Sequence, residues 1–322
     1  MKLRFVRGRF GNQNLEMNPR DVVELLQELI RIPSVNPDNS SDPTACGEER
    51  LAKSLAEWLS GFGADVQLEE VLPQRPNLIA RFAPRDGRPR ILLGPHLDTV
   101  GVEGMTIDPF AGEISLGRIW GRGASDTKAS MAAMLWAWLE QREAMQDLPV
   151  AVDFVAFMGE ESGQWGSKQF AAKYAADYQF AVVGEPTRLN VVHLTKGSLW
   201  ATLRSTGRAA HSSMPQLGEN AIFKLIRALD RLDCVLEPVL VKDPHPVLGV
   251  STMNVGLIRG GTRPNIVPEW AEAEIDIRTT PALARAGGAL RCLRETIDRH
   301  ALPIEVVNPH ENPPMETAAD HP

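Results

Sequence analysis

Apolar residues recur at helical spacing in three segments of the first half of the chain. In the first segment they form one face between residues 22 and 30, with Asn18 and Pro19 before them as N-cap and first turn and Ile32-Pro33 at the end. The other two segments span residues 47–60 and 129–140. The pattern predicts three helices, of which the first two are clearly amphipathic.

Short runs rich in apolar and β-branched residues alternate with these helices. The runs at 65–68, 77–82 and 90–93 predict strands. Residues 150–158 are almost wholly apolar, which is typical of a strand buried on both faces of an open sheet, and residues 180–183 repeat that pattern. Strands that alternate with helices predict an α/β sandwich.

The order of elements changes after Pro186. The pattern predicts strand 191–205, helix 220–232, strands 251–258 and 269–278, helix 282–300 and strand 304–307. This βαββαβ order predicts a ferredoxin-like α+β unit inserted into the first domain. We therefore expect a disordered extension at 1–16, a first domain at 17–189, an inserted domain at 190–307, and at 308–322 the start of a segment that returns to the first domain.

Length, charge and cysteine content narrow the class of protein. A chain of 322 residues favours two domains, because single cores stop growing near about 250–300 residues. The net charge of -7 argues against nucleic acid or an anionic membrane as the main partner, since both bind clustered Lys and Arg. Only three scattered cysteines and no long apolar run favour a reduced, cytoplasmic setting without export or membrane insertion.

Potential metal ligands follow the predicted strands of the first domain. The strand at 90–93 leads into His96 and Asp98, whose side chains point to the same side of an extended segment, so that His96 can bind a metal while Asp98 orients its ring. Open α/β sheets place their sites at the carboxyl ends of strands. The spacing therefore predicts that this strand end belongs to a site.

Carboxylates follow at three further positions. Asp126 lies in a glycine-bearing loop before a helix, Glu160 and Glu161 follow the buried strand at 150–158, and Glu185 follows the strand at 180–183. A single His-x-Asp is usually a hydrogen-bonded pair, and a single Glu-Glu is usually a solvated surface. Their succession at consecutive strand ends instead predicts a set of nitrogen and oxygen ligands that suits zinc, manganese or cobalt.

From about Met17 onward, the chain resembles the M20 metallopeptidase and deacylase family. This family includes acetylornithine deacetylase, succinyl-diaminopimelate desuccinylase, aminoacylase and a carboxypeptidase that removes glutamate from folates. The resemblance rests on the order of His96-x-Asp98, Asp126, Glu160-Glu161, Glu185 and, in the inserted unit, His211. It implies a mixed-sheet, zinc-peptidase-like catalytic domain, with the inserted unit as a lid that also serves dimerisation.

The resemblance also implies roles for these residues. His96 and Glu185 would bind one metal ion, Asp126 would bridge two, and Glu161 would bind the other. The cofactors would be two divalent ions, zinc in the first place, with cobalt or manganese as alternatives. The implied reaction is hydrolysis of an amide bond by water that both ions activate, with Glu160 as the general base.

Three residues of the inserted unit match family positions that contact the substrate. The resemblance implies that His211 stabilises the oxyanion in the partner subunit's site. It also implies that Asn265 and Arg278 bind the substrate, and that Arg278 does so by pairing with the carboxylate group of the substrate. His211 could instead be a hydrogen-bonded loop residue, and Arg278 an ordinary exposed strand residue. The family's lid acts across a dimer, so we expect a homodimer formed through this unit.

The carboxyl end departs from the family pattern. The family completes its second metal site with a histidine on a segment that returns to the first domain, and no such segment follows Val307, so we expect a truncated chain. Pro313-Pro314-Met315-Glu316 is expected to be a linker rather than a strand. Either the chain belongs to a longer enzyme, or it binds one metal or none. His310 or His321 could instead substitute for the missing ligand, although each is expected to lie on an unanchored tail.

Three functions remain open at this point. The first is an amidohydrolase that acts on a small N-acylated amino acid, similar to acetylornithine deacetylase or the desuccinylase. The second is a dipeptidase or carboxypeptidase with the same chemistry. The third is a non-catalytic metal-binding or dimerisation protein, which the missing last ligand favours.

Overall fold

A computed structural model describes residues 17–40, 42–318 and 320–321 of the chain. The chain divides into two compact units, Met1–Leu189 and Asn190–Pro322, called unit 1 and unit 2 below. The disordered extension expected at 1–16 lies outside the described residues. Within those residues, no helix has both the length and the apolar character needed to cross a membrane.

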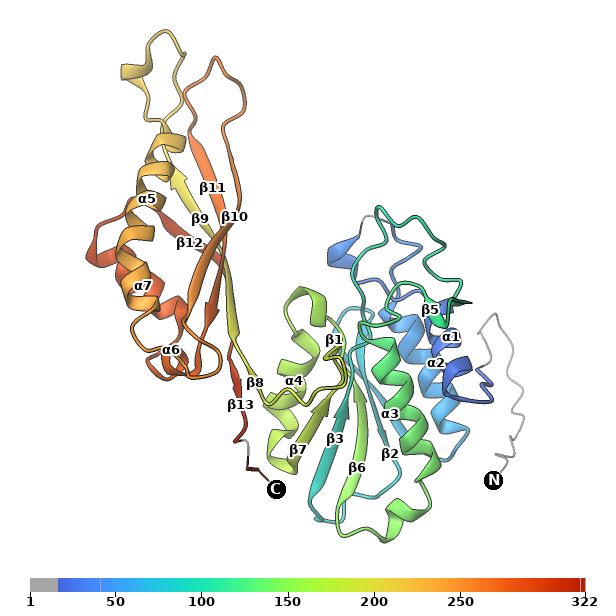
Figure 1. Ribbon diagram of the computed structural model, residues 1–322. Coiled ribbons are helices and arrows are strands. Elements are labelled where there is room, and N and C mark those ends of the chain that lie inside the picture. Colours follow the sequence, from blue (N-terminus) through green and yellow to red (C-terminus); the bar gives the residue numbers. More distant parts are fainter. Residues whose placement is uncertain (1–16, 41, 319, 322) are drawn as a thin grey trace. The chain divides into compact units, whose positions relative to one another are not determined.

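Unit 1 is built on a five-stranded mixed sheet in the order β1-β2-β6-β3-β7 (Figure 1). The strands β6, β3 and β7 run parallel, whereas β1, β2 and β6 pair antiparallel. The helices are α1 (Val22–Arg31), α2 (Glu48–Ser60), α3 (Lys128–Glu140) and α4 (Trp165–Tyr174). The strands are β1 (Asp65–Leu72), β2 (Arg75–Arg81), β3 (Arg90–Gly94), β6 (Ala151–Ala156) and β7 (Tyr178–Val183), with a separate hairpin of β4 (Glu113–Ser115) and β5 (Arg118–Trp120).

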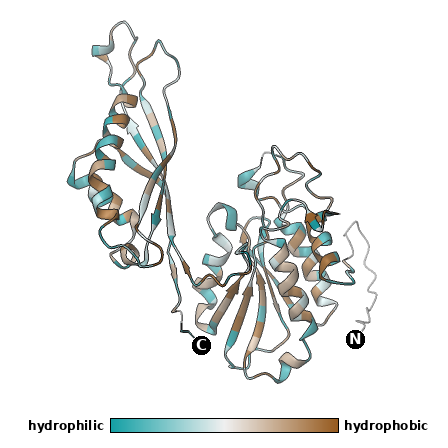
Figure 2. Ribbon diagram, in the orientation of Figure 1, coloured by the Kyte–Doolittle hydropathy of each residue, from teal (hydrophilic) through white to brown (hydrophobic). Residues whose placement is uncertain are grey.

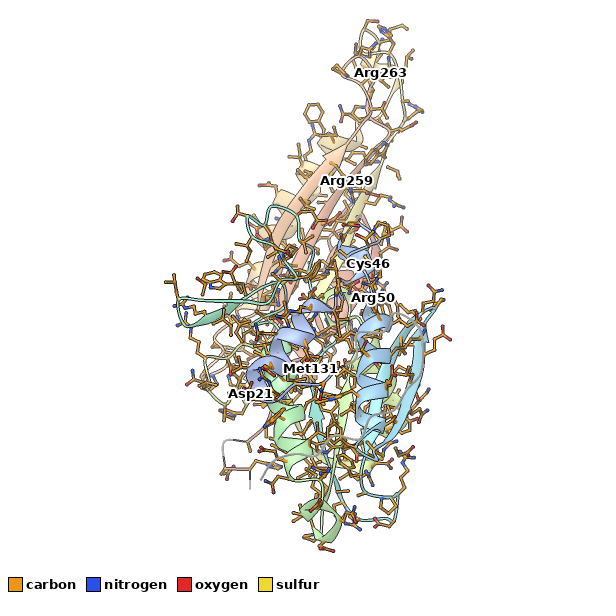
Figure 3. The ribbon with its side chains drawn as sticks, turned by 90° about the vertical axis from the view of Figure 1, so that its right-hand side faces the viewer. Asp21, Cys46, Arg50, Met131, Arg259 and Arg263 are labelled. Carbon is orange, nitrogen blue, oxygen red and sulfur yellow. The ribbon has the colours of Figure 1, made fainter. Side chains whose placement is uncertain are left out.

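Helices cover both faces of this sheet. Leu25 of α1, Leu51 of α2 and Met131 of α3, which Figure 3 labels, are buried in one cluster with side chains of β2 and β6. The opposite face packs against α4, where Phe170 joins a second cluster with Ile79. The brown central strands in Figure 2 match this burial, because a strand between two helical layers has no solvent-facing side. Unit 1 is therefore an α/β sandwich of three layers.

The first helix begins three residues later than the sequence pattern suggested. Asp21, not Asn18, is the N-cap, and its carboxylate accepts hydrogen bonds from the backbone amides of Val23 and Glu24, each at 2.9 Å. Asp and Asn cap helices about equally well, so composition alone could not choose between them. Figure 3 labels Asp21 at this position.

The prediction that residues 180–183 form a doubly buried strand is wrong in its burial. The strand exists as β7, but it pairs only with β3 among the described strands and its side chains are largely exposed, Val183 to 58%. An apolar run cannot distinguish an edge strand from a central one, because both have the same period. The interior strand β6, by contrast, is buried as predicted.

Unit 2 is a four-stranded antiparallel sheet with helices packed against it. The strand order is β10-β11-β9-β12, and the elements follow one another as strand, helix, strand, strand, helix and strand. The helices α5 and α7 contribute Leu225 and Leu293 to a core shared with Leu203 and Ile275 of the sheet. The elements are β8 (Leu194–Thr195), β9 (Gly197–Thr206), α5 (Ala221–Leu240), β10 (Thr252–Gly260), β11 (Trp270–Thr279), α6 (Pro281–Arg285), α7 (Ala289–Arg299), β12 (Glu305–Asn312) and β13 (Met315–Glu316).

Unit 2 differs from the sequence prediction at two places. The helix expected at 282–300 is broken into α6 and α7 at Gly287 and Gly288, which adopt φ values of +112° and +87° that a helix cannot contain. At the carboxyl end, β12 continues to Asn312, and residues Met315–Glu316, expected to be a linker, form β13 and pair with β8. His310 is therefore part of the unit 2 sheet and not of an unanchored tail.

Candidate metal centre

The three parallel strands of unit 1 end at one edge of its sheet. His96 and Asp98 follow β3, Glu160 and Glu161 follow β6, and Glu185 follows β7. The bridge between His96 and Phe157 continues the pairing of β3 with β6 up to the point where these residues begin. The alternation of strands and helices thus brings five polar side chains to a single edge, as expected for an open α/β sheet.

Four of the predicted ligands lie close together at this edge. The His96 Nε2 atom is 3.0 Å from Asp126 Oδ1 and 3.9 Å from Glu185 Oε1. One ligand atom each from His96, Asp126 and Glu161 lie within 4.8 Å of one another. The imidazole is only 3% exposed, whereas the side chains of Asp126 and Glu185 are 52% and 38% exposed. The nitrogen donor therefore forms the floor of the site, and carboxylates form its accessible rim.

The loop that carries Asp126 is anchored on both sides. The hydroxyl group of Thr127 donates to the carbonyl oxygen of Gly184 at 2.6 Å, which ties Asp126 to the end of β7 beside Glu185. The ammonium group of Lys128 donates to the carbonyl oxygens of Leu29 and Ile32 at 2.9 and 2.8 Å. Complete burial lowers the pKa of Lys128 to about 7. These bonds fix the loop against the end of α1.

Asp98 contacts site residues that follow two different strands, His96 after β3 and the two glutamates after β6. Its carboxylate accepts hydrogen bonds from the backbone amides of Glu160 and Glu161, each at 3.0 Å, and from the side chain of Asn36 at 2.7 Å. The His96 Nδ1 atom lies 2.9 Å from the main-chain oxygen of Asp98 and 3.5 Å from its carboxylate. Burial opposes ionisation, but these bonds and the charge of His96 lower the pKa of Asp98. An ionised Asp98 thus fixes the backbone of both glutamates and the orientation of the His96 ring.

A buried arginine behind the site was not predicted from the sequence. Arg75 of β2 contacts Glu48 of α2, Asp38 at 2.9 Å and the side-chain oxygen of Asn36 at 3.1 Å. The Glu48 carboxylate in turn accepts the amide hydrogen of Gly159 at 2.7 Å, immediately before the two glutamates. Arg75 and Glu48 are 27 residues apart on separate elements, so no local pattern could pair them.

The electrostatics of the site favour a bound cation. Burial alone would lower the pKa of His96, but hydrogen bonds to Asp126 and Asp98 raise it to about 11. Burial, reinforced by neighbouring carboxylates and partly offset by His96, raises the pKa values of Glu161 and Glu185 to about 7. Carboxylates crowd together in this way at the cost of mutual repulsion, which a divalent cation relieves. One imidazole nitrogen and several carboxylate oxygens also match the donor preference of zinc, manganese and cobalt.

The three predicted residues of unit 2 do not form one cluster. His211 and Asn265 lie together, since the amide of Ser212 donates to the carbonyl oxygen of Asn265 at 3.1 Å. The His211 Nδ1 atom lies 2.8 Å from the Ser213 hydroxyl oxygen. Arg278 lies near the opposite end of β11 and pairs there with Asp276 at 2.9 Å. The structure thus separates Arg278 from the other two along the length of a ten-residue strand.

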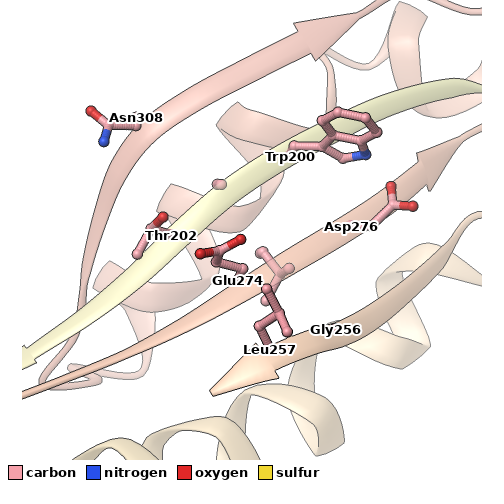
Figure 4. A pocket seen from close by; sticks show the side chains of 9 residues that line it. Trp200, Thr202, Gly256, Leu257, Glu274, Asp276 and Asn308 are labelled. Atoms are coloured by element: carbon pink, nitrogen blue, oxygen red, sulfur yellow. The ribbon is translucent and has the colours of Figure 1, made fainter. Parts of the chain in front are cut away.

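A shallow pocket of about 400 Å³ opens on the sheet face of unit 2 (Figure 4). Trp200, Leu257, Glu274 and Asp276 line it. Its described walls include none of the predicted substrate residues of this unit. The pocket therefore carries no part of the candidate site.

Comparison with known proteins identifies the family to which this chain is similar. The sequence model of the family described as Peptidase family M20/M25/M40 matches residues 92–321. The acetylornithine deacetylase of Vibrio cholerae serotype O1 is 32% identical over 284 residues, which cover 86% of this chain and 74% of that protein.

Solved structures show the same fold. The M20 family metallo-carboxypeptidase Sso-CP2 from Sulfolobus solfataricus superposes with a TM-score of 0.72 at 20% identity, over 93% of this chain and 80% of the other. The Bacillus subtilis YXEP protein, a dinuclear metal binding peptidase from the M20 family, superposes with a TM-score of 0.54 at 15% identity, over 92% and 74%. The chain belongs to the M20/M25/M40 peptidase family and is a hydrolase of its metallopeptidase and amidohydrolase group.

Proposed function

We propose that this chain hydrolyses the amide bond of a small N-acylated amino acid, in the manner of an acetylornithine deacetylase. The observation that carries the proposal is the convergence of His96, Asp126 and Glu161, with ligand atoms within 4.8 Å, beside the second carboxylate Glu160. The acetylornithine deacetylase of Vibrio cholerae, at 32% identity, supports this choice of substrate class.

We assign the metal ligands as follows. His96 and Glu185 hold one divalent ion, Asp126 bridges, and Glu161 holds a second ion. The rim position of Asp126 suits a bridging role, because an exposed carboxylate can offer one oxygen to each of two ions. When bound, the ions supply the Lewis acidity that acidifies a water molecule and polarises the substrate carbonyl group.

Glu160 is the residue that moves the proton. It directly precedes Glu161, and the backbone amides of both residues donate to Asp98, so the backbone of Glu160 is held beside the proposed ligands. We assign it to accept the proton of the attacking water and to deliver that proton to the leaving amine. The hydrogen bonds that the two backbone amides donate to Asp98 hold the Glu160 backbone in place during this transfer.

The residues of unit 2 are assigned to the substrate. The Ser213 amide donates to His211 Nδ1 at 3.2 Å, so a neutral ring carries its proton on Nε2 and can donate it to an oxyanion. We assign His211 and Asn265, which lie together, to the substrate in the partner subunit's site, and Arg278, at the other end of β11, to a substrate carboxylate as a bidentate partner. In this proposal unit 2 is the ferredoxin-like lid, inserted into the catalytic domain.

We further propose that two copies of the chain associate through unit 2. The strand β10 is an edge of its sheet and carries exposed apolar side chains, among them Leu257 at 61% exposure. Arg259 marks this strand in Figure 3, and α5 of the same unit also exposes the apolar side chains of Phe223 and Ile226. A long, apolar edge strand is a template for pairing, and a second copy offers a matching strand. Leu257→Lys should convert a dimer to a monomer in light scattering without unfolding the protein.

A carboxypeptidase or dipeptidase is the second candidate, because the Sulfolobus solfataricus structure with the TM-score of 0.72 is a metallo-carboxypeptidase. The deciding experiment supplies zinc, manganese or cobalt and compares N-acetyl amino acids with dipeptides. Turnover of the N-acetyl compounds, abolished in Glu160→Gln, supports the deacylase. Preferential cleavage of dipeptides supports the second candidate. A protein that binds metal but cleaves neither class contradicts both and supports the non-catalytic alternative.

A further inference from the structure

The turn that carries the two adjacent glutamates ends in a residue with an unfavourable backbone conformation. Within Gly159–Gln164, three residues have φ values in the left-handed region, Gly159 at +67°, Gly163 at +133° and Gln164 at +60°. Glycine adopts these values without steric cost, whereas a residue with a Cβ atom does not. A glutamine at the third position is therefore retained against the backbone preference.

The side chain of Gln164 does not cap the helix α4, although Gln164 stands at its N-cap position. Gln164 is the N-cap of α4, where Ser, Thr, Asp and Asn are favoured because their short side chains bond to the first amides. Within the described part of the chain, Gln164 makes no such capping bond. Its Nε2 atom instead donates to the Glu160 Oε1 atom at 3.1 Å. The backbone amide of Gln164 closes the turn on the carbonyl oxygen of Gly159 at 2.8 Å.

The hydrogen bond from Gln164 to Glu160 makes the surroundings of two adjacent carboxylates different. Glu160 and Glu161 are chemically identical, and both follow β6 at the edge where His96 and Asp126 lie. Their backbone amides receive the same support from Asp98, at 3.0 Å each. The backbone contacts therefore do not determine which of the two glutamates binds metal and which transfers protons. A contact of one side chain must make that difference.

We infer that Gln164 is a positioning residue that separates the roles of the two carboxylates. Its amide holds one oxygen of Glu160 and keeps this carboxylate out of the ligand set, which Glu161 completes. The inference rests on the proposed function, since it presumes that Glu160 acts on protons and Glu161 on metal. Stored backbone strain at such a position is expected where it maintains a functional geometry.

Two substitutions at Gln164 test the inference against a purely structural role. Gln164→Asn keeps an amide and suits both the left-handed conformation and the N-cap, but it is one methylene too short to hold Glu160. Gln164→Gly removes the strain together with the side chain. We expect both variants to unfold at or above the wild-type temperature, with kcat lowered about tenfold and KM within about twofold.

Gln74→Gly is the matched control. Gln74 also has a left-handed φ, +61°, but it is an exposed residue of the turn between β1 and β2. This variant should match Gln164→Gly in unfolding temperature and keep the wild-type kcat. Wild-type kcat in both Gln164 variants would overturn the inference, as would a loss of turnover that merely follows a loss of stability.

Cobalt(II) binding provides a readout that does not depend on turnover. Visible absorption of the protein loaded with Co(II) should change in Gln164→Gly, because the released Glu160 joins the ligands. In a Glu160→Gln background the same substitution should leave the spectrum unchanged. A spectral change that persists in that background, no change at all, or failure of the wild-type protein to bind Co(II) would each overturn the inference. If the wild-type protein binds Co(II) but has no amidase activity, only the proposed function fails, and the spectra still decide the role of Gln164.

Discussion

Removal of divalent ions should make the stability of unit 1 fall as the pH rises from about 4.5 to 7. The folded protein raises the pKa of Glu161 and of Glu185 from 4.5 to about 7. A carboxyl group with a raised folded-state pKa contributes stability that is fully present below pH 4.5 and is lost as the pH rises through about 7. The raised pKa of His96 acts in the same direction, because the unfolded chain loses its proton first.

The size of this effect follows from the two shifts. From 4.5 to about 7 is about 2.5 pKa units, or about 3.4 kcal/mol for each group at 1.36 kcal/mol per unit. Glu185 is 38% exposed and Glu161 is half-buried, so solvent screening reduces each value to about 1–1.5 kcal/mol. Together they amount to about 2–3 kcal/mol, which corresponds to about 4–12 °C in the unfolding temperature of a domain of this size.

Calorimetry of chelator-treated protein at several pH values measures this slope. The control is the double variant Glu161→Gln/Glu185→Gln, which lacks both titrating groups and should show a flatter pH dependence. Saturating zinc should reverse the slope, because the ligands must lose their protons before they bind the ion. A chelated wild-type protein whose unfolding temperature follows the double variant at every pH would refute the electrostatic description of the site.

Three further outcomes are expected from single changes in unit 1. Glu160→Ala should keep the metal content of the wild-type protein in elemental analysis and lose nearly all turnover; loss of metal would contradict its assignment as base. Arg75→Met leaves Glu48 as a buried, unpaired charge and should cost about 3–5 kcal/mol in urea unfolding, of which Glu48→Gln in the same chain should restore most. Lys128→Met leaves two carbonyl oxygens at the end of α1 without their donor and should lower stability by about 2 kcal/mol, and an unchanged midpoint in urea would contradict this anchoring role.

The convergence of the candidate metal ligands could be predicted from the sequence because these residues follow strands. His96 and Glu161 each come after an apolar run, and an apolar run of that length predicts a strand whose end lies at a sheet edge. The order of the parallel strands then brings the ligands together without further information. Local pattern and global fold agree at these positions.

The supporting contacts could not be predicted in this way. The pairing of Arg75 with Glu48 joins two elements that are distant in sequence, and the left-handed conformation of Gln164 contradicts the local preference of its residue type. The exposure of β7 depends on which strands flank it, which its own residues do not encode. Sequence patterns thus predicted which polar residues converge at the sheet edge, whereas the contacts that orient them required the structure.

Anomalous diffraction at the zinc edge, from crystals grown with zinc, tests the proposed metal centre most directly. We expect one zinc peak about 2.0–2.2 Å from His96 Nε2, Glu185 and an oxygen of Asp126, and a second peak at about the same distance from Glu161 and the other oxygen of Asp126. Zinc found elsewhere on the chain, or no zinc between His96 and Asp126 at saturating concentration, would contradict the claim that the strand ends of unit 1 form a metal centre.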